Sequence, residues 1–188
     1  MNDQAERTSK TGLVITVSGF HGSGRSTHAK KLAEAFNLRY VSSGTIFRQM
    51  AEERGVSLEE MSKLTEEDPE LDRMIDERAN EESKKEGVVI DATLSGWMAH
   101  EPDIRIFLKT PFEARIRRIA EREGIPYGEA EKETRVREES ERERFWEYYG
   151  VDVTDLSIYD VILNTELYEP EGTARILKRV VEEYCSIR

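Results

Sequence analysis

The sequence has little of what a disulfide scaffold, a membrane span or a secretory signal requires. Among its 188 residues there is one cysteine, Cys185, so neither an internal disulfide nor a cysteine-based zinc module can form. No apolar run approaches the roughly 20 residues that a membrane helix needs. Residues 1–12 contain no apolar segment of the kind found in a signal peptide. These absences favour a soluble, cytoplasmic protein without a membrane partner.

Basic residues are also scarce relative to acidic ones. The chain has 28 lysines and arginines against 39 aspartates and glutamates, for a formal net charge of −11. Proteins that bind nucleic acid normally present a basic patch, so we expect no nucleic-acid partner. The imbalance is concentrated in residues 52–86, which hold 14 acidic residues against 6 basic ones. Such a run is typical of a solvated helical face, and it leaves other regions able to bind anions.

Short, β-branched apolar runs alternate with helical patterns along the chain. The strand-like runs are residues 13–18, 38–42, 88–91, 104–108 and 161–163. Nearly continuous apolar strands separated by helices are typical of a parallel sheet that is covered on both faces. We therefore predict an α/β fold with a parallel sheet of about five strands flanked by helices, after a flexible tail over residues 1–12.

A glycine-rich loop between the first strand and the first helix is the strongest signal. It follows the pattern G-x-x-x-x-G-[basic]-S-T and consists of Gly19, Phe20, His21, Gly22, Ser23, Gly24, Arg25, Ser26 and Thr27. Such glycines let successive backbone N–H groups point at one anion, and the helix N-terminus adds its positive end. The pattern predicts a P-loop that binds the phosphates of ATP, with Arg25 where a lysine is expected.

Two oxygen-bearing side chains are candidates for holding Mg²⁺ beside this loop. The hydroxyl of Ser26 occupies the P-loop position that binds the metal. Asp91 ends the third strand, where a P-loop protein needs a carboxylate that holds Mg²⁺ directly or through water. The alternative for Asp91 is an acid that merely ends a strand at a turn. We predict Mg²⁺ as the cofactor, bound together with ATP.

Further motifs follow the P-loop in a characteristic order. They are residues 41–48, 66–72, 94–98, 137–144, 149–152 and 155–160, then Asn164 and Thr165. With these segments the chain resembles the nucleoside-monophosphate kinases, and among them it is most similar to the archaeal type of cytidylate kinase. Many NTPases share the P-loop, whereas the stretch from 137 to 160 is far more specific.

The resemblance implies a fold, a reaction and a set of site residues. It implies a single P-loop kinase domain over residues 13–188, with a helical segment (52–86) that closes over the monophosphate and a lid (124–150) that closes over the triphosphate. The reaction implied is transfer of the γ-phosphate of ATP to CMP or dCMP, giving ADP and CDP or dCDP, by a monomer. The monophosphate site implied comprises Ser43, Gly44, Arg48, Asp76, Arg78, Gly96 and Trp97. The catalytic arginines implied are Arg25, Arg137, Arg142 and Arg144.

The spacing of the lid arginines admits two interpretations. On a straight helix, positions 137, 141 and 144 share a face, so Arg137 and Arg144 project together and Arg142 projects to the side. Fixed arginines would neutralise the negative charges that phosphoryl transfer brings together. The alternative is a surface helix with pairs such as Glu138 and Arg142.

Departures from the family pattern leave other functions open. Arg25 in place of the P-loop lysine makes a nucleotide-binding regulatory protein of low turnover an alternative, although we expect Arg25→Lys to be tolerated. Thr93 stands where the family usually has an arginine that helps to hold the acceptor phosphate, so UMP, AMP or a small alcohol are alternative acceptors. His21 and Phe20 stand where the family has prolines.

Overall fold

The computed structural model describes residues 12–187. The tail expected over residues 1–12 therefore lies, apart from Gly12, outside the described residues. No helix within the described part is long and apolar enough to cross a membrane.

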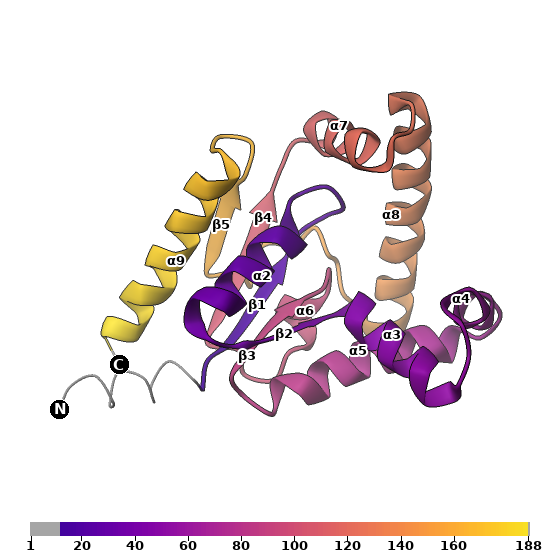
Figure 1. Cartoon of the computed structure of the whole chain (residues 1–188), viewed down its shortest axis with the longest axis horizontal. Coiled ribbons are helices and arrows are strands. Elements are labelled where there is room, and N and C mark those ends of the chain that lie inside the picture. Colours follow the sequence, from indigo (N-terminus) through magenta and orange to yellow (C-terminus); the bar gives the residue numbers. More distant parts are fainter. Residues whose placement is uncertain (1–11, 188) are drawn as a thin grey trace.

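A parallel five-stranded sheet forms the centre of the molecule (Figure 1). Its strand order is β2-β3-β1-β4-β5, and all neighbouring pairs are parallel. The strands are β1 (Val14–Ser18), β2 (Arg39–Ser42), β3 (Val88–Asp91), β4 (Ile104–Lys109) and β5 (Val161–Asn164). Because the strands are parallel, the segments that follow them all start at one edge of the sheet. The prediction of a five-stranded parallel sheet is confirmed.

Side chains alternate between the two faces of the sheet along each strand, so both faces carry apolar side chains. Helices cover both faces. On one face, Ile15 and Val17 of β1 pack with α2 (Arg25–Phe36) and α9 (Pro170–Ser186). On the other face, Val14 packs with α3 (Ser43–Arg54), α4 (Leu58–Glu67) and α5 (Pro69–Ser83). The short helix α6 (Ser95–Met98) contacts β1 and α5.

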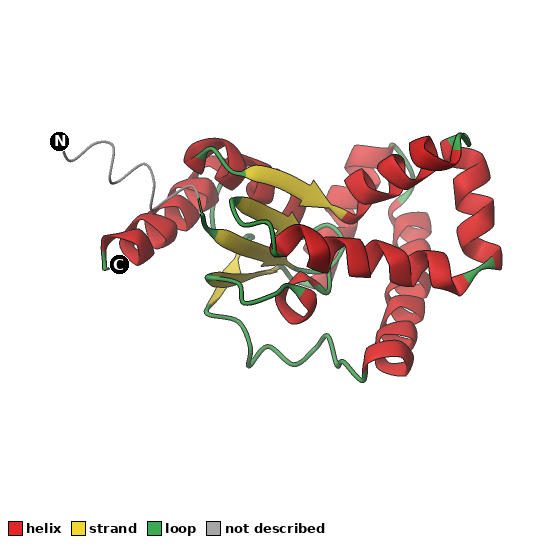
Figure 2. Ribbon diagram, turned by 90° about the horizontal axis from the view of Figure 1, so that it is seen from below, coloured by secondary structure: helices red, strands yellow, loops and turns green. Residues whose placement is uncertain are grey.

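Two helices extend from the edge of the sheet where the strands end (Figures 1 and 2). They are α7 (Phe112–Glu123) and the long α8 (Tyr127–Tyr149), which lies in the region expected to form the lid. Of the 23 residues of α8, only Ala130, Thr134 and Phe145 are buried. A helix with so small an apolar face is held in place mainly by its polar contacts and its ends.

Candidate functional site

The P-loop folds as its glycines require. Three of them have positive φ: Gly19 at 149°, Gly22 at 80° and Gly24 at 86°. At Gly22 a Cβ atom would lie 2.6 Å from the carbonyl oxygen of Arg115, so a larger residue there would clash with the backbone of α7. The loop thus presents its N–H groups to one concave side, at the N-terminus of α2.

Side chains from distant segments hold the carbonyl oxygens of the P-loop. Arg115 Nη1 donates to the carbonyl of His21 over 2.9 Å, and Arg118 Nη1 donates to that of Gly22 over 3.4 Å. Thr165 Oγ1, which follows β5, donates to the carbonyl of Ser23 over 2.9 Å. The loop is therefore fixed from outside, with its carbonyl groups already bonded.

A small cavity of about 120 Å³ lies within the curve of this loop. It is lined by Phe20, His21, Gly22, Gly24, Arg25, Ser26, Thr27 and Arg122. Seven of these residues belong to the predicted P-loop, and Arg122 of α7 adds a positive charge. The shape, the N–H groups and the charge of this cavity suit the phosphates of a nucleotide.

Arg25 does not extend along the phosphate loop. Its Nε donates to Asp91 Oδ1 over 2.5 Å, and its Nη1 donates to Thr93 Oγ1 over 2.9 Å and to the carbonyl of Gly19 over 2.8 Å. Asp91 is 1% exposed, and its second oxygen accepts a 2.6 Å hydrogen bond from Tyr40. The guanidinium thus joins the P-loop to the end of β3, in contact with the threonine that stands at the family's arginine position.

A second cavity, of about 160 Å³, adjoins the first. It is lined by residues of the core, of α5 and of α8: His21, Arg25, Ser43, Ile75, Asp76, Ala92, Thr93, Leu94, Arg137, Glu141, Arg144 and Phe145. The structure therefore brings together Ser43 and Asp76 of the predicted monophosphate site with the lid arginines Arg137 and Arg144. Because His21 and Arg25 line both cavities, the two cavities meet at these side chains.

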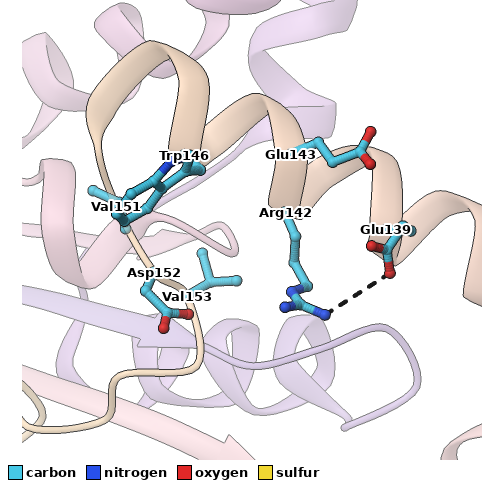
Figure 3. A pocket seen from close by; sticks show the side chains of 7 residues that line it. All are labelled: Glu139, Arg142, Glu143, Trp146, Val151, Asp152 and Val153. Carbon is cyan, nitrogen blue, oxygen red and sulfur yellow. Dashed lines mark ion pairs between the residues drawn. The ribbon is translucent and has the colours of Figure 1, made fainter.

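Arg142 lies on another face of α8. It lines a cavity of about 260 Å³ together with Glu139, Glu143, Trp146, Val151, Asp152 and Val153 (Figure 3). Its Nη1 is 3.8 Å from Glu139 Oε2. The helical spacing had indicated this separation, with Arg137 and Arg144 on one face and Arg142 to the side. The structure therefore does not place Arg142 with the other lid arginines.

Other residues of the predicted monophosphate site lie around the second cavity without lining it. Gly44 and Arg48 are exposed at the start of α3. Arg78 makes two hydrogen bonds, of 2.9 and 2.6 Å, to the carboxylate of Glu53. These residues do not share a wall with Ser43 and Asp76 in this arrangement of α3 and α5.

Gly96 and Trp97 pack against other side chains and do not line the second cavity. A Cβ atom on Gly96 would lie 2.6 Å from the ring of Tyr159, so the close packing there requires a glycine. The Trp97 side chain packs with Leu94, Phe145 and Val153. Trp97 thus packs behind Leu94 and Phe145, two buried residues that line the second cavity.

A further cavity, of about 280 Å³, was not predicted, and it is called the third cavity because it adjoins the P-loop whereas the cavity at Arg142 does not. It is lined by Gly24, Thr27, His28, Arg118, Thr165, Tyr168, Pro170 and Thr173. His28 Nδ1 and Thr173 Oγ1 are buried there without a hydrogen-bond partner among the described residues. Burial, with the charges of Lys31 and Arg118, lowers the pKa of His28, so its ring is neutral at pH 7. His28 and Thr173 lie at helical positions that look like ordinary core positions, so nothing in the sequence pattern marked them.

Ser26 and Asp91 are the side chains near the P-loop that could hold Mg²⁺. Ser26 lines the phosphate cavity and is exposed, whereas both oxygens of Asp91 already accept hydrogen bonds. No group of three or more acidic, histidine or cysteine side chains able to hold a metal occurs in the described part of the chain. Mg²⁺ commonly binds through few protein oxygens, with water and substrate phosphates as its remaining ligands. The residues fit such a site, with Ser26 as a direct ligand and Asp91 acting through water.

Comparison with known proteins identifies the family to which this geometry belongs. A model of the cytidylate kinase-like family matches residues 14–167. The cytidylate kinase of Pyrococcus horikoshii is 47% identical over 173 residues, which cover 92% of this chain and 90% of that protein. The cytidylate kinase of Haloarcula marismortui is 44% identical over 174 residues, covering 92% and 91%.

Solved structures with a similar fold have much less similar sequences. The shikimate kinase of Acinetobacter baumannii, determined in complex with shikimate, has a TM-score of 0.59 and 15% sequence identity, covering 95% of this chain and 98% of that one. The shikimate kinase of Bacteroides thetaiotaomicron has a TM-score of 0.57 and 17% identity, covering 90% and 98%. At this level of identity the likeness shows a shared fold.

Proposed function

The chain belongs to the cytidylate kinase-like family, and we propose that it transfers the γ-phosphate of ATP to CMP or dCMP, giving ADP and CDP or dCDP. One observation of the structure carries this proposal. A phosphate-sized cavity in the P-loop and a second cavity beside the predicted acceptor residues meet at His21 and Arg25. In-line phosphoryl transfer requires this arrangement, because donor and acceptor phosphates must meet with their charges neutralised.

We propose that ATP, the phosphate donor, occupies two of the cavities. The N–H groups of the P-loop and Arg122 bind its phosphates, and Ser26 holds Mg²⁺ with Asp91 acting through water. Bound Mg²⁺ would neutralise the charge of the β- and γ-phosphates. The third cavity takes the nucleoside, because it shares Gly24 and Thr27 with the phosphate cavity. Polar side chains that line this cavity, among them Arg118, Thr165 and Tyr168, would face the nucleoside.

The acceptor monophosphate is proposed to lie in the second cavity. Ser43, Asp76 and Arg25 line this cavity, and Arg48 and Arg78 would reach the acceptor when α3 and α5 close over it. Thr93 itself carries no charge, but Arg25 donates to it over 2.9 Å. Arg25 therefore supplies a guanidinium at the position where the sequence lacks an arginine. This geometry supports a nucleoside monophosphate as the acceptor despite that departure.

The transferring phosphoryl group is proposed to pass between Arg25, Arg137 and Arg144. All three line the second cavity, and positive charge placed there in advance stabilises the charge that the transition state spreads over the phosphoryl oxygens. No protein side chain is modified, since the acceptor oxygen attacks the γ-phosphorus directly. A monomer as the working unit stays a prediction. A cytoplasmic location, where both nucleotides occur, stays a prediction.

A panel of acceptors tests the proposal. ADP formation from ATP and Mg²⁺ is measured with CMP, dCMP, UMP, AMP and shikimate in parallel, and then with Mg²⁺ replaced by EDTA. We expect the highest kcat/KM with CMP or dCMP and no turnover without the metal. A preference for UMP, AMP or the alcohol would overturn the acceptor assignment. ATP binding without turnover on any acceptor would instead support a regulatory protein.

A further inference from the structure

A glutamate to which the sequence motifs assigned no role lies among the arginines where the two phosphate cavities meet. Glu141 of α8 lines the second cavity together with Arg25, Arg137 and Arg144. Its two carboxylate oxygens are 3.0 and 3.1 Å from His21 Nε2, and Arg137 Nε donates to Oε1 over 3.3 Å. The side chain of Glu141 is 16% exposed, and that of His21 is 17% exposed. The carboxylate thus joins the lid helix to the P-loop.

The carboxylate is negatively charged in these surroundings. Burial by itself raises the pKa of Glu141, but the hydrogen bond and charge of His21, with Arg137 and Arg25, outweigh burial and hold the pKa below its ordinary value. A partly buried anion bonded to a P-loop side chain and to a lid arginine has the same partners that a phosphate oxygen would have.

We propose that Glu141 is a positioning residue that takes the place of a phosphate in the nucleotide-free protein. It holds Arg137 and His21 at the junction of the two cavities and offsets the repulsion among the arginines. When the triphosphate binds, its oxygens replace the carboxylate on these partners, and Glu141 moves aside. This inference rests on the proposed binding of ATP phosphates at the P-loop.

Neighbouring contacts show why Glu141, and not Glu138, can be exchanged for a ligand. Glu138, one turn earlier on α8, pairs with Arg115 over 2.5 Å, and Arg115 in turn donates to the carbonyl of His21. The side chains of Arg115 and Glu138 are 7% and 15% exposed, respectively. They line none of the cavities described above. The Glu138 pair therefore keeps α8 docked while Glu141, which faces the cavity, gives way to a ligand.

The substitution Glu141→Gln tests the inference, because it keeps the shape of the side chain and removes its charge. Dissociation constants for ATP and for inorganic tripolyphosphate are measured by calorimetry. We expect both ligands to bind E141Q about tenfold more tightly than the parent, since they no longer displace an anion, corresponding to about 1.4 kcal/mol. The matched control is Glu139→Gln, which removes an equal charge from the Arg142 face of α8 and should leave both constants unchanged.

The outcomes separate this inference from the proposed function. Unchanged or weaker binding by E141Q would overturn the role of Glu141, whereas a parent protein that binds neither ligand would overturn the proposed function itself. Equal tightening in E139Q would show a general effect of net charge and would also overturn the role. Glu141→Asp, which keeps the charge, should bind both ligands within about twofold of the parent. If E141Q does not fold, Glu141→Ser removes the same charge and is measured in its place.

Discussion

The donor loop and the acceptor segment are held in contrasting ways. The P-loop is fixed by buried side chains, among them Arg115, which is 6% exposed, and Thr165, which is 3% exposed. The acceptor segment of α3 and α5 is joined at its surface by the pair of Arg78 and Glu53, whose side chains are 34% and 55% exposed. Polar contacts that are buried resist opening much more than contacts that water can replace.

From this contrast we expect the acceptor segment, rather than the P-loop, to move during a catalytic cycle. A donor site whose loop is fixed in advance binds phosphate without reorganisation. The acceptor segment packs on the sheet through apolar side chains, but the exposed polar contact between α3 and α5 can break at small cost when the segment closes to exclude water from the transferring group. The sequence led us to expect closure of both the acceptor segment and the lid. In this structure the lid helix α8 is bonded to the P-loop through His21 and Glu141, and the closure of both segments stays a prediction.

The largest effect is expected from breaking the buried anchor of the P-loop. Arg115→Ala leaves the partly buried Glu138 without its partner and frees the carbonyl of His21. Removal of one member of a buried ion pair costs about 3–5 kcal/mol. We expect the free energy of unfolding, measured by urea denaturation, to fall by this amount. A loss below about 1 kcal/mol would show that the donor loop is held no more firmly than the acceptor segment.

The next largest effect concerns Arg25, which serves both cavities. Arg25→Ala should reduce kcat about 10²–10³-fold, the scale of losing one preorganised donor. Arg25→Lys should cost about tenfold or more, because one ammonium nitrogen cannot occupy the separate positions of Nε, which bonds Asp91, and Nη1, which bonds Thr93 and the carbonyl of Gly19. From the sequence alone we expected Arg25→Lys to be tolerated, because a lysine is usual at this position of a P-loop. Steady-state kinetics with ATP and CMP decide between the two, and full activity of R25K would restore the original expectation.

Much of the fold could be predicted because its signals are local. The five apolar runs became the five strands to within one residue at each end. The short helix α6 was missed, because four residues are too few to show a helical period. The strand order could not be read from the sequence, since it depends on which strands pair across long connections.

The sequence predicted which segments contribute to the site, but it did not predict the hydrogen bonds that join them. The P-loop pattern located the phosphate cavity, and the helical spacing separated Arg142 from Arg137 and Arg144. Two features depend on tertiary structure and left no pattern. One is the bond from Arg25 to Thr93, which spans 68 positions of the chain, and the other is the bond from His21 to Glu141, which spans 120. The individual roles of the site residues stay predictions.

A pair of lid variants sharpens the comparison on the donor side. Arg144→Ala removes a charge from the cavity that contains Arg25, and we expect kcat to fall about 10²-fold. Arg142→Ala removes a charge from the opposite cavity, and we expect kcat to change by less than about threefold. The catalytic role predicted for Arg142 stays open to this test. Equal losses in the two variants, measured under saturating substrates, would show that Arg142 joins the site when nucleotides bind.

A smaller effect is expected from removing the contact between the lid helix α8 and the acceptor segment. Tyr149 of α8 donates to Asp76 Oδ2 of α5 over 3.1 Å, and burial together with Asp76 raises the pKa of the tyrosine, so it stays a donor across the neutral range. Tyr149→Phe removes about 1 kcal/mol of this contact. Hydrogen exchange of α5 and α8 should rise about fivefold without nucleotide and should return to parental values with a bisubstrate analogue. Unchanged exchange would mean that the two segments move independently.

The smallest effect is expected at the exposed pair of Arg78 and Glu53. An ion pair in water contributes about 0–1 kcal/mol, so Arg78→Ala and Glu53→Gln should each lower the free energy of unfolding by no more than that, and by less at high salt. The two variants differ in the acceptor site. If Arg78 leaves Glu53 to bind the monophosphate on closure, R78A raises the KM for CMP several-fold, and E53Q, which frees Arg78, leaves it unchanged or lowers it. Since the contact belongs to ground state and transition state alike, kcat should change little. An equal rise of KM in both variants would assign the pair a structural role, and the acceptor segment would then resemble the donor loop in needing a fixed contact.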